Sequence, residues 1–159
     1  DAGDDIAVVK RFSGSFGFDA NERTRIYTGL GSVIGAMRLV GRGVNSSTNG
    51  GGDNILRRMT FEPDWWGPHH FLMDARGSRV CSGDKGSPIL DFTPSHGHRV
   101  VAGLLSHWQD SPGFNLCAGW GKKMRAVRLQ RKIAFIEDML DVHCRQFNDS
   151  GWAYVKCFQ

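Results

Sequence analysis

The chain has 159 residues, of which 40% are hydrophobic and 23% charged, the composition of an ordinary globular protein. No run of about 18 apolar residues occurs, so no membrane span is expected. The formal net charge of +4 is small and the Lys and Arg residues are scattered. Because no nucleic-acid-binding motif accompanies them, we expect no nucleic-acid partner.

Short apolar runs separated by turn-forming clusters predict an all-β fold with an antiparallel sheet. The chain has 21 glycines against 5 prolines, and clusters such as NSSTNGGGD and PDWWGP stand between the apolar runs. In chain order, we predict strands at residues 5–10, 35–41, 54–61 and 98–106.

The one stretch with a helical pattern spans residues 127–140. Its apolar residues recur at spacings of four, three and four, which gives a helix one apolar face. These residues are Leu129, Ile133, Ile136 and Leu140.

The chain has four cysteines, Cys81, Cys117, Cys144 and Cys157. A zinc site needs closer spacing and histidine partners, so we expect no metal and interpret the cysteines as disulfides formed in an oxidising compartment. The pattern alone leaves all three pairings open. The N-x-S/T triplets at Asn45 and Asn148 agree with secretion.

Four segments occur in the order in which chymotrypsin-like serine proteases have them. DIAVVK opens with Asp5, as does the strand whose aspartate orients the catalytic histidine, and LVGRGV at 39–44 is similar to the segment that starts the second barrel. CSGDKGSP at 81–88 is similar to the nucleophile loop, and VAGLLSHW at 101–108 to the strand that lines the substrate cleft. The chain therefore resembles the C-terminal portion of this family.

The resemblance implies a chymotrypsin-like double β-barrel, with the second barrel complete, the last strands of the first, and a C-terminal α-helix. Residues 1–143 would form this part of the protease domain, and residues 144–159 an extension beyond it. The resemblance also implies a Cys81–Cys117 disulfide and, with it, a Cys144–Cys157 disulfide that closes a hairpin in the extension.

The nucleophile position of the loop holds Lys85 instead of serine. Lysine side chains are protonated at neutral pH, and an acylated amine would be a stable amide, so we expect no turnover. The resemblance makes Asp5 the remaining triad carboxylate and Gly83 part of an oxyanion hole. It makes Asp84 the carboxylate that pairs with a new α-amino group on activation.

No histidine of the chain has the sequence context of the family's catalytic imidazole. The six are His69, His70, His96, His98, His107 and His143. In the family the catalytic histidine precedes the aspartate, so we expect a second polypeptide that supplies the N-terminal part of barrel one and any such histidine.

Three residues are candidates for ligand binding. Arg79 stands six residues before Lys85, where the family has its pocket floor, and a guanidinium there would suit an acidic side chain. The alternative is an Arg79 that points outward. Ser106 and Trp108 are expected at the cleft wall.

Together these features predict a secreted, noncatalytic serine-protease homologue that binds a protein or glycan and needs no cofactor. The first alternative is a serine endopeptidase chain, either inactivated or weakly active with its partner chain. The second is a structural subunit of a hetero-oligomeric assembly.

Overall fold

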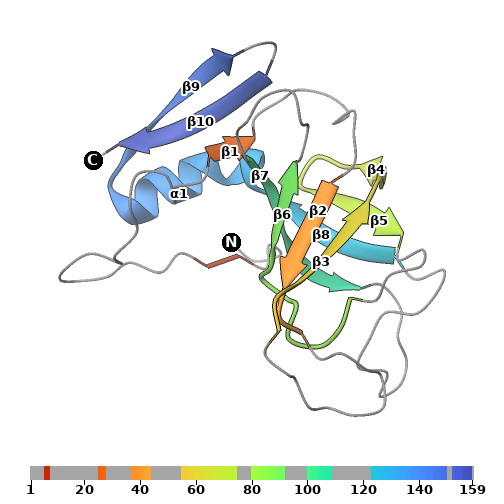
Figure 1. Ribbon diagram of the computed structural model, residues 1–159. Coiled ribbons are helices and arrows are strands. Elements are labelled where there is room, and N and C mark those ends of the chain that lie inside the picture. The colour runs from red at the N-terminus through yellow and green to blue at the C-terminus, as the bar shows by residue number, and fades with distance from the viewer. Residues whose placement is uncertain are drawn as a thin grey trace.

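The computed structural model describes residues 6–7, 25–27, 37–43, 55–74, 80–91, 100–108, 123–149 and 152–158. Strands dominate this part of the chain, and one short helix, α1 (Ile133–Leu140), lies near the C-terminus (Figure 1). The strands are β1 (Arg25–Tyr27), β2 (Met37–Gly41), β3 (Arg57–Phe61), β4 (Pro63–Trp66), β5 (His70–Asp74), β6 (Pro88–Asp91), β7 (Val100–Trp108), β8 (Lys123–Arg128), β9 (His143–Asp149) and β10 (Trp152–Phe158). The expected β-rich fold with a C-terminal helix is confirmed in this form.

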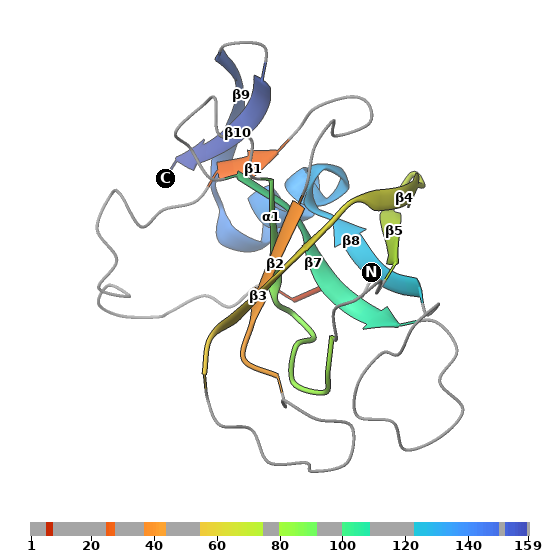
Figure 2. The ribbon, with the colours of Figure 1, turned by 45° about the vertical axis from the view of Figure 1, so that its right-hand side comes forward.

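The described strands form one hydrogen-bonded sheet that branches at β7. One path runs from β3 through β2, β6, β7, β8 and β5 to β4, with antiparallel neighbours throughout. The other path leaves β7 through β1, which is parallel to it, and continues to β10 and β9. The start of β7 pairs with β1 and its remainder with β8, so this long strand joins the two parts of the sheet (Figure 2).

The core lies on the inner face of the antiparallel path. Burial alternates along β2 and β5, because successive side chains of a strand point to opposite faces. The core residues are Met37, Leu39, Met59, Phe61, Phe71, Met73, Val80, Ile89, Ala102, Leu105, Met124 and Ala126. Gly103 lies where β7 approaches its neighbours most closely, since a Cβ there would be 2.5 Å from the Val127 carbonyl oxygen and 2.8 Å from the Phe71 ring.

The strands predicted at 35–41, 54–61 and 98–106 are confirmed as β2, β3 and β7, with shifted ends. The strand predicted at 5–10 falls mostly outside the described residues. PDWWGP was expected as a turn, and this expectation is wrong because Pro63–Trp66 forms β4. A proline is tolerated there since, among the described strands, β4 pairs with β5 alone and Pro63 is its first residue.

The helix is shorter than the predicted 127–140. Val127 and Arg128 remain in β8, because they pair with β5 and β7, and residues Leu129–Lys132 form a 3₁₀ turn before α1 begins. The helix ends at Asp141, which adopts the left-handed conformation at φ 53° and donates its amide to the Glu137 carbonyl. In the described part of the chain, no helix is long and apolar enough to cross a bilayer.

The C-terminal hairpin of β9 and β10 is confirmed, together with the Cys144–Cys157 disulfide between directly opposite residues. The hairpin is part of the main sheet, since Ile26 and Tyr27 of β1 pair with Val155 and Tyr154 of β10. Figures 1 and 2 both show the hairpin beside β1 at one end of the molecule. Strands β9 and β10 therefore extend the sheet.

Candidate functional site

The segment from Cys81 to Ser87 forms two successive turns before β6. The Asp84 amide donates to the Cys81 carbonyl at 3.0 Å, and the Ser87 amide donates to the Asp84 carbonyl at 3.0 Å. Gly83 and Gly86 have φ values of 91° and 82°. Residues with side chains rarely adopt these conformations, so the glycines allow the loop to turn twice within seven residues.

The carboxylate of Asp84 anchors this loop from inside the protein. Asp84 is only 8% exposed, and its two oxygens accept from different backbone amides. Oδ1 accepts from the Gly43 amide at 2.7 Å, and Oδ2 from the Cys81 amide at 2.9 Å. A buried carboxylate needs such donors to offset its lost hydration, and these two bind the loop both to itself and to the end of β2.

Gly41 and Gly43 make room for this carboxylate. A Cβ at Gly41 would collide with Asp84 Oδ1, and one at Gly43 would lie 2.5 Å from Oδ2 and from the carboxyl carbon. The G-x-G spacing therefore lets the backbone after β2 approach a buried anion closely.

The loop is also hydrogen-bonded to β7. The Gly86 amide donates to the Leu105 carbonyl at 2.7 Å, and the Leu105 amide donates to the Ser87 carbonyl at 3.0 Å. These bonds bring the residue that follows Leu105, Ser106, to the side of the loop.

Ser106 and His107 are neighbours in sequence whose side chains nevertheless meet. The register of β7 shifts between Leu105 and His107, which is a β-bulge, and the Ser106 hydroxyl lies 2.9 Å from His107 Nδ1. Ser106 is only 3% exposed, so its hydroxyl is covered by protein.

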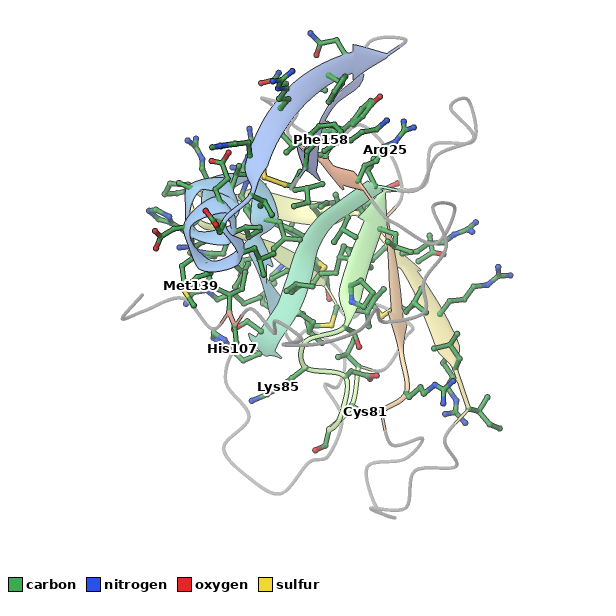
Figure 3. The ribbon with its side chains drawn as sticks, turned by 90° about the vertical axis from the view of Figure 1, so that its left-hand side faces the viewer. Arg25, Cys81, Lys85, His107, Met139 and Phe158 are labelled. Atoms are coloured by element: carbon green, nitrogen blue, oxygen red, sulfur yellow. A yellow bond between two sulfur atoms is a disulfide. The ribbon has the colours of Figure 1, made fainter. Side chains whose placement is uncertain are left out.

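Lys85 lies at the exposed tip of the loop. Figure 3 shows its side chain pointing away from the protein, at the same end of the molecule as Cys81 and His107. Ser82 is also exposed, whereas Ser87 is half-buried at the start of β6. The loop thus presents an ammonium between two glycines of fixed conformation.

The structure brings four of the predicted site residues together: Gly83, Asp84, Lys85 and Ser106. Asp5, Arg79 and Cys117 lie outside the described residues. Trp108 lies at the end of β7, where its backbone pairs with Met124. Cys81 is disulfide-bonded, as expected. Its expected partner, Cys117, lies outside the described residues.

The structural roles of Gly41, Gly43 and His107 were not predicted from the sequence. The two glycines belong to LVGRGV at 39–44, which was used above only for its resemblance to the start of the second barrel. A G-x-G after an apolar run is itself a signal of close backbone approach. The contact of His107 depends on a bulge, which the sequence does not reveal. Within the described residues, no group of three or more His, Cys, Asp and Glu side chains is placed to hold a metal.

A second buried ionic group lies apart from the loop, at the end of β8. Arg128 Nη1 donates to the Gly67 carbonyl at 2.7 Å, and Nη2 donates to Gln130 Oε1 at 2.8 Å. Burial, and then the nearby charge of Arg131, lower the pKa of the Arg128 guanidinium. These bonds hold the segment between β4 and β5 against the start of the 3₁₀ turn.

Comparison with known proteins assigns no family. No family model matches the chain, and no curated protein matches it at a significant level.

Proposed function

We propose that the chain is a secreted, noncatalytic homologue of the chymotrypsin-like serine proteases that binds another protein through the end of the molecule bearing Lys85. The observation that carries this proposal is the loop at residues 81–87, which is held by its two glycines, the Asp84 carboxylate and bonds to β7, and which displays a lysine at its tip. The ordered sequence segments described above support the same assignment.

The described anchors of the loop lie at other residues than Lys85. Two left-handed glycines and the buried Asp84 carboxylate hold the loop, and none of these contacts uses the Lys85 side chain. A serine at this position would be presented for nucleophilic attack, whereas a lysine is presented as a fixed positive charge. Binding an acidic group is the chemistry that such a charge performs best.

The other described serines do not supply a nucleophile. Ser106 is bonded to an imidazole but is buried. Ser82 and Ser87 form no hydrogen bond with a histidine among the described residues. The pairing of an accessible hydroxyl with a base, which acyl transfer requires, is therefore not found in the part of the chain that the structure describes.

Exposed apolar side chains near the loop support a protein as the ligand. Ile55 and Leu56 are 56% and 59% exposed, and they immediately precede Arg57, which pairs with Gly41 at the end of β2. That end of β2 leads to Gly43, the residue bonded to Asp84. Apolar side chains and an ammonium thus lie at the same end of the sheet, a combination that suits an acidic, partly apolar protein surface.

Labelling with a fluorophosphonate tests the absence of catalysis. The chain should show no mass increase at any serine, and Lys85→Ala should behave in the same way, while an active serine protease in the same tube is labelled to completion. Labelling of Ser82, Ser87 or Ser106 in the folded chain would contradict the proposal.

A serine endopeptidase chain is the second candidate, and the well-anchored backbone of the loop at residues 81–87 supports it. Lys85→Ser would restore the hydroxyl in a loop whose backbone is already formed. Peptidase activity in this variant, but not in the native chain, would show that the remaining machinery is intact and that Lys85 alone prevents catalysis.

A further inference from the structure

One face of the C-terminal hairpin and the neighbouring strand β1 carries a row of three positive charges across three adjacent strands. Lys156 of β10 lies directly opposite Arg145 of β9. Ile26 of β1 pairs with Val155, so Arg25 is the next residue along and falls opposite Lys156 on its other side. Because neighbouring strands are about 4.8 Å apart, the row Arg25–Lys156–Arg145 spans about 10 Å between its outer backbones.

A row of aromatic residues lies beside these cations on the same face. Tyr154 pairs with Tyr27 on one side and with Phe147 on the other. The rings of Phe147 and Tyr154 are stacked, with centroids 5.7 Å apart, and Phe158 lies 6.2 Å from Phe147.

The aromatic rings hold two of the cations in place. The Arg25 guanidinium lies over the Tyr154 ring, 4.4 Å from its centroid. Lys156 Nζ lies 5.3 Å from the centroid of Phe147 and 5.8 Å from that of Tyr154. Cation–π contacts of this kind fix the charged groups without neutralising them, so the charges remain able to attract an anion.

The three cations have no acidic partner within the described part of the chain. None of Arg25, Arg145 and Lys156 forms an ion pair there. Like charges directly opposite one another in a sheet are destabilising, so the Lys156–Arg145 pair works against folding. An arrangement that is unfavourable in the free protein becomes favourable when a ligand with closely spaced negative charges covers it.

The aromatic rings do not suit a nucleic acid, so the cations are the main contacts that this face offers to a ligand. Tyr154 is only 7% exposed, with Arg25 over one face of its ring, so it offers no open face on which a base could stack. Phe158, by contrast, is 46% exposed and adds apolar surface at the edge of the row. The hairpin is closed by the Cys144–Cys157 disulfide, and disulfides persist in the oxidising environments where sulfated polysaccharides occur.

From this arrangement, we propose that the face formed by Arg25, Arg145, Lys156 and the adjacent aromatic residues binds a sulfated polysaccharide. This face is separate from the Lys85 loop, as Figure 3 shows Arg25 and Phe158 at the opposite end of the molecule from Lys85 and Cys81. The polysaccharide site therefore does not depend on the proposed protein-binding function of the Lys85 loop.

The test uses a heparin-type sulfated decasaccharide and the double variant Arg145→Gln/Lys156→Gln. The matched control is Arg57→Gln/Arg58→Gln, which removes the same charge from two adjacent exposed arginines of β3. Binding is measured by calorimetry at several salt concentrations. We expect the hairpin variant to bind at least tenfold more weakly, with a salt dependence lower by about two charges, and the control to stay within about twofold of the native chain.

Three outcomes would overturn the proposal. One is an equal loss of affinity in both variants, which would mean that only net charge matters. Another is native-like binding by the hairpin variant. The third is tighter binding of a single-stranded oligonucleotide, or of vesicles rich in anionic lipid, than of a decasaccharide of equal charge. An unchanged Cys144–Cys157 disulfide and unfolding midpoint in the hairpin variant show that its fold is intact.

Discussion

The Oδ1 atom of Asp84 lies 2.7 Å from the amide nitrogen of Gly43, a residue 41 positions away in the chain. This bond joins the turn that carries Lys85 to the end of β2. Together with the bond from the Cys81 amide, it gives the loop a defined conformation. A loop anchored in this way presents residue 85 from a backbone of fixed shape.

Asp84→Asn should destabilise the protein. The amide group of asparagine has one acceptor oxygen, so one of the two backbone amides that now donate to Asp84 would be left without an acceptor in a buried position. We expect a loss of about 1–3 kcal/mol in the free energy of unfolding, measured by urea denaturation. Asp138→Asn, on the exposed side of α1, is the control and should change stability by less than about 0.5 kcal/mol.

Gly43→Ala tests the close approach between the Gly43 backbone and the Asp84 carboxylate. The new Cβ would lie 2.5 Å from the Asp84 carboxylate, so the loop or β2 must shift. We expect a loss of about 1–3 kcal/mol by the same measurement. In Gly86→Ala the Cβ meets nothing within 4 Å, and only the φ of 82° opposes it, which costs about 1–2 kcal/mol. If Gly43→Ala combined with Asp84→Asn cost the full sum of the single changes, the two residues would not be coupled as we describe.

Arg128→Lys should destabilise the protein even though it keeps the charge. A lysine ammonium cannot make both the bond to the Gly67 carbonyl and the bond to Gln130 in the same geometry, and it is more strongly hydrated than a guanidinium. The expected loss is about 1–2 kcal/mol in thermal or urea unfolding.

Arg131→Gln should stabilise the protein, in contrast to Arg128→Lys. The charge of Arg131 lowers the pKa of Arg128, which means that it disfavours the charged form of the buried group. Removing that repulsion should stabilise the folded protein by a few tenths of a kcal/mol, about the size of an exposed charge interaction. A clear loss of stability in Arg131→Gln would show that Arg131 makes a favourable contact that this account omits.

Cys144→Ser/Cys157→Ser should loosen the hairpin. The disulfide joins residues 13 apart, and loss of a cross-link of this size costs about 3 kcal/mol in the chain-entropy description. Amide hydrogen exchange should accelerate most in β9 and β10, and then in β1, which pairs with β10. Acceleration confined to the antiparallel path from β3 to β4 would contradict the topology.

The sequence predicted much of the fold because its signals are local. The alternation in β2 and the apolar run of β7 identify strands directly, and glycine clusters mark the turns. The start of the helix was misplaced because Val127 and Arg128 belong to a buried strand end, which cannot be distinguished from helix by periodicity. Tertiary pairing with β5 and β7 decides their conformation.

The candidate site was only partly predictable, for a different physical reason. Gly83, Asp84 and Lys85 stand together in the sequence, so their proximity is assured. The bond between Asp84 and Gly43, and the row of Arg25, Lys156 and Arg145, depend on strand order and register, which no single stretch of sequence encodes.

Intact-mass spectrometry of the native chain, exposed to a peptide ester substrate under conditions that trap acyl intermediates, tests the absence of catalysis most directly. We expect the chain to keep its mass of 17.6 kDa, with no acyl adduct and no sustained cleavage. An acyl group mapped to a serine of this chain during steady turnover would contradict it.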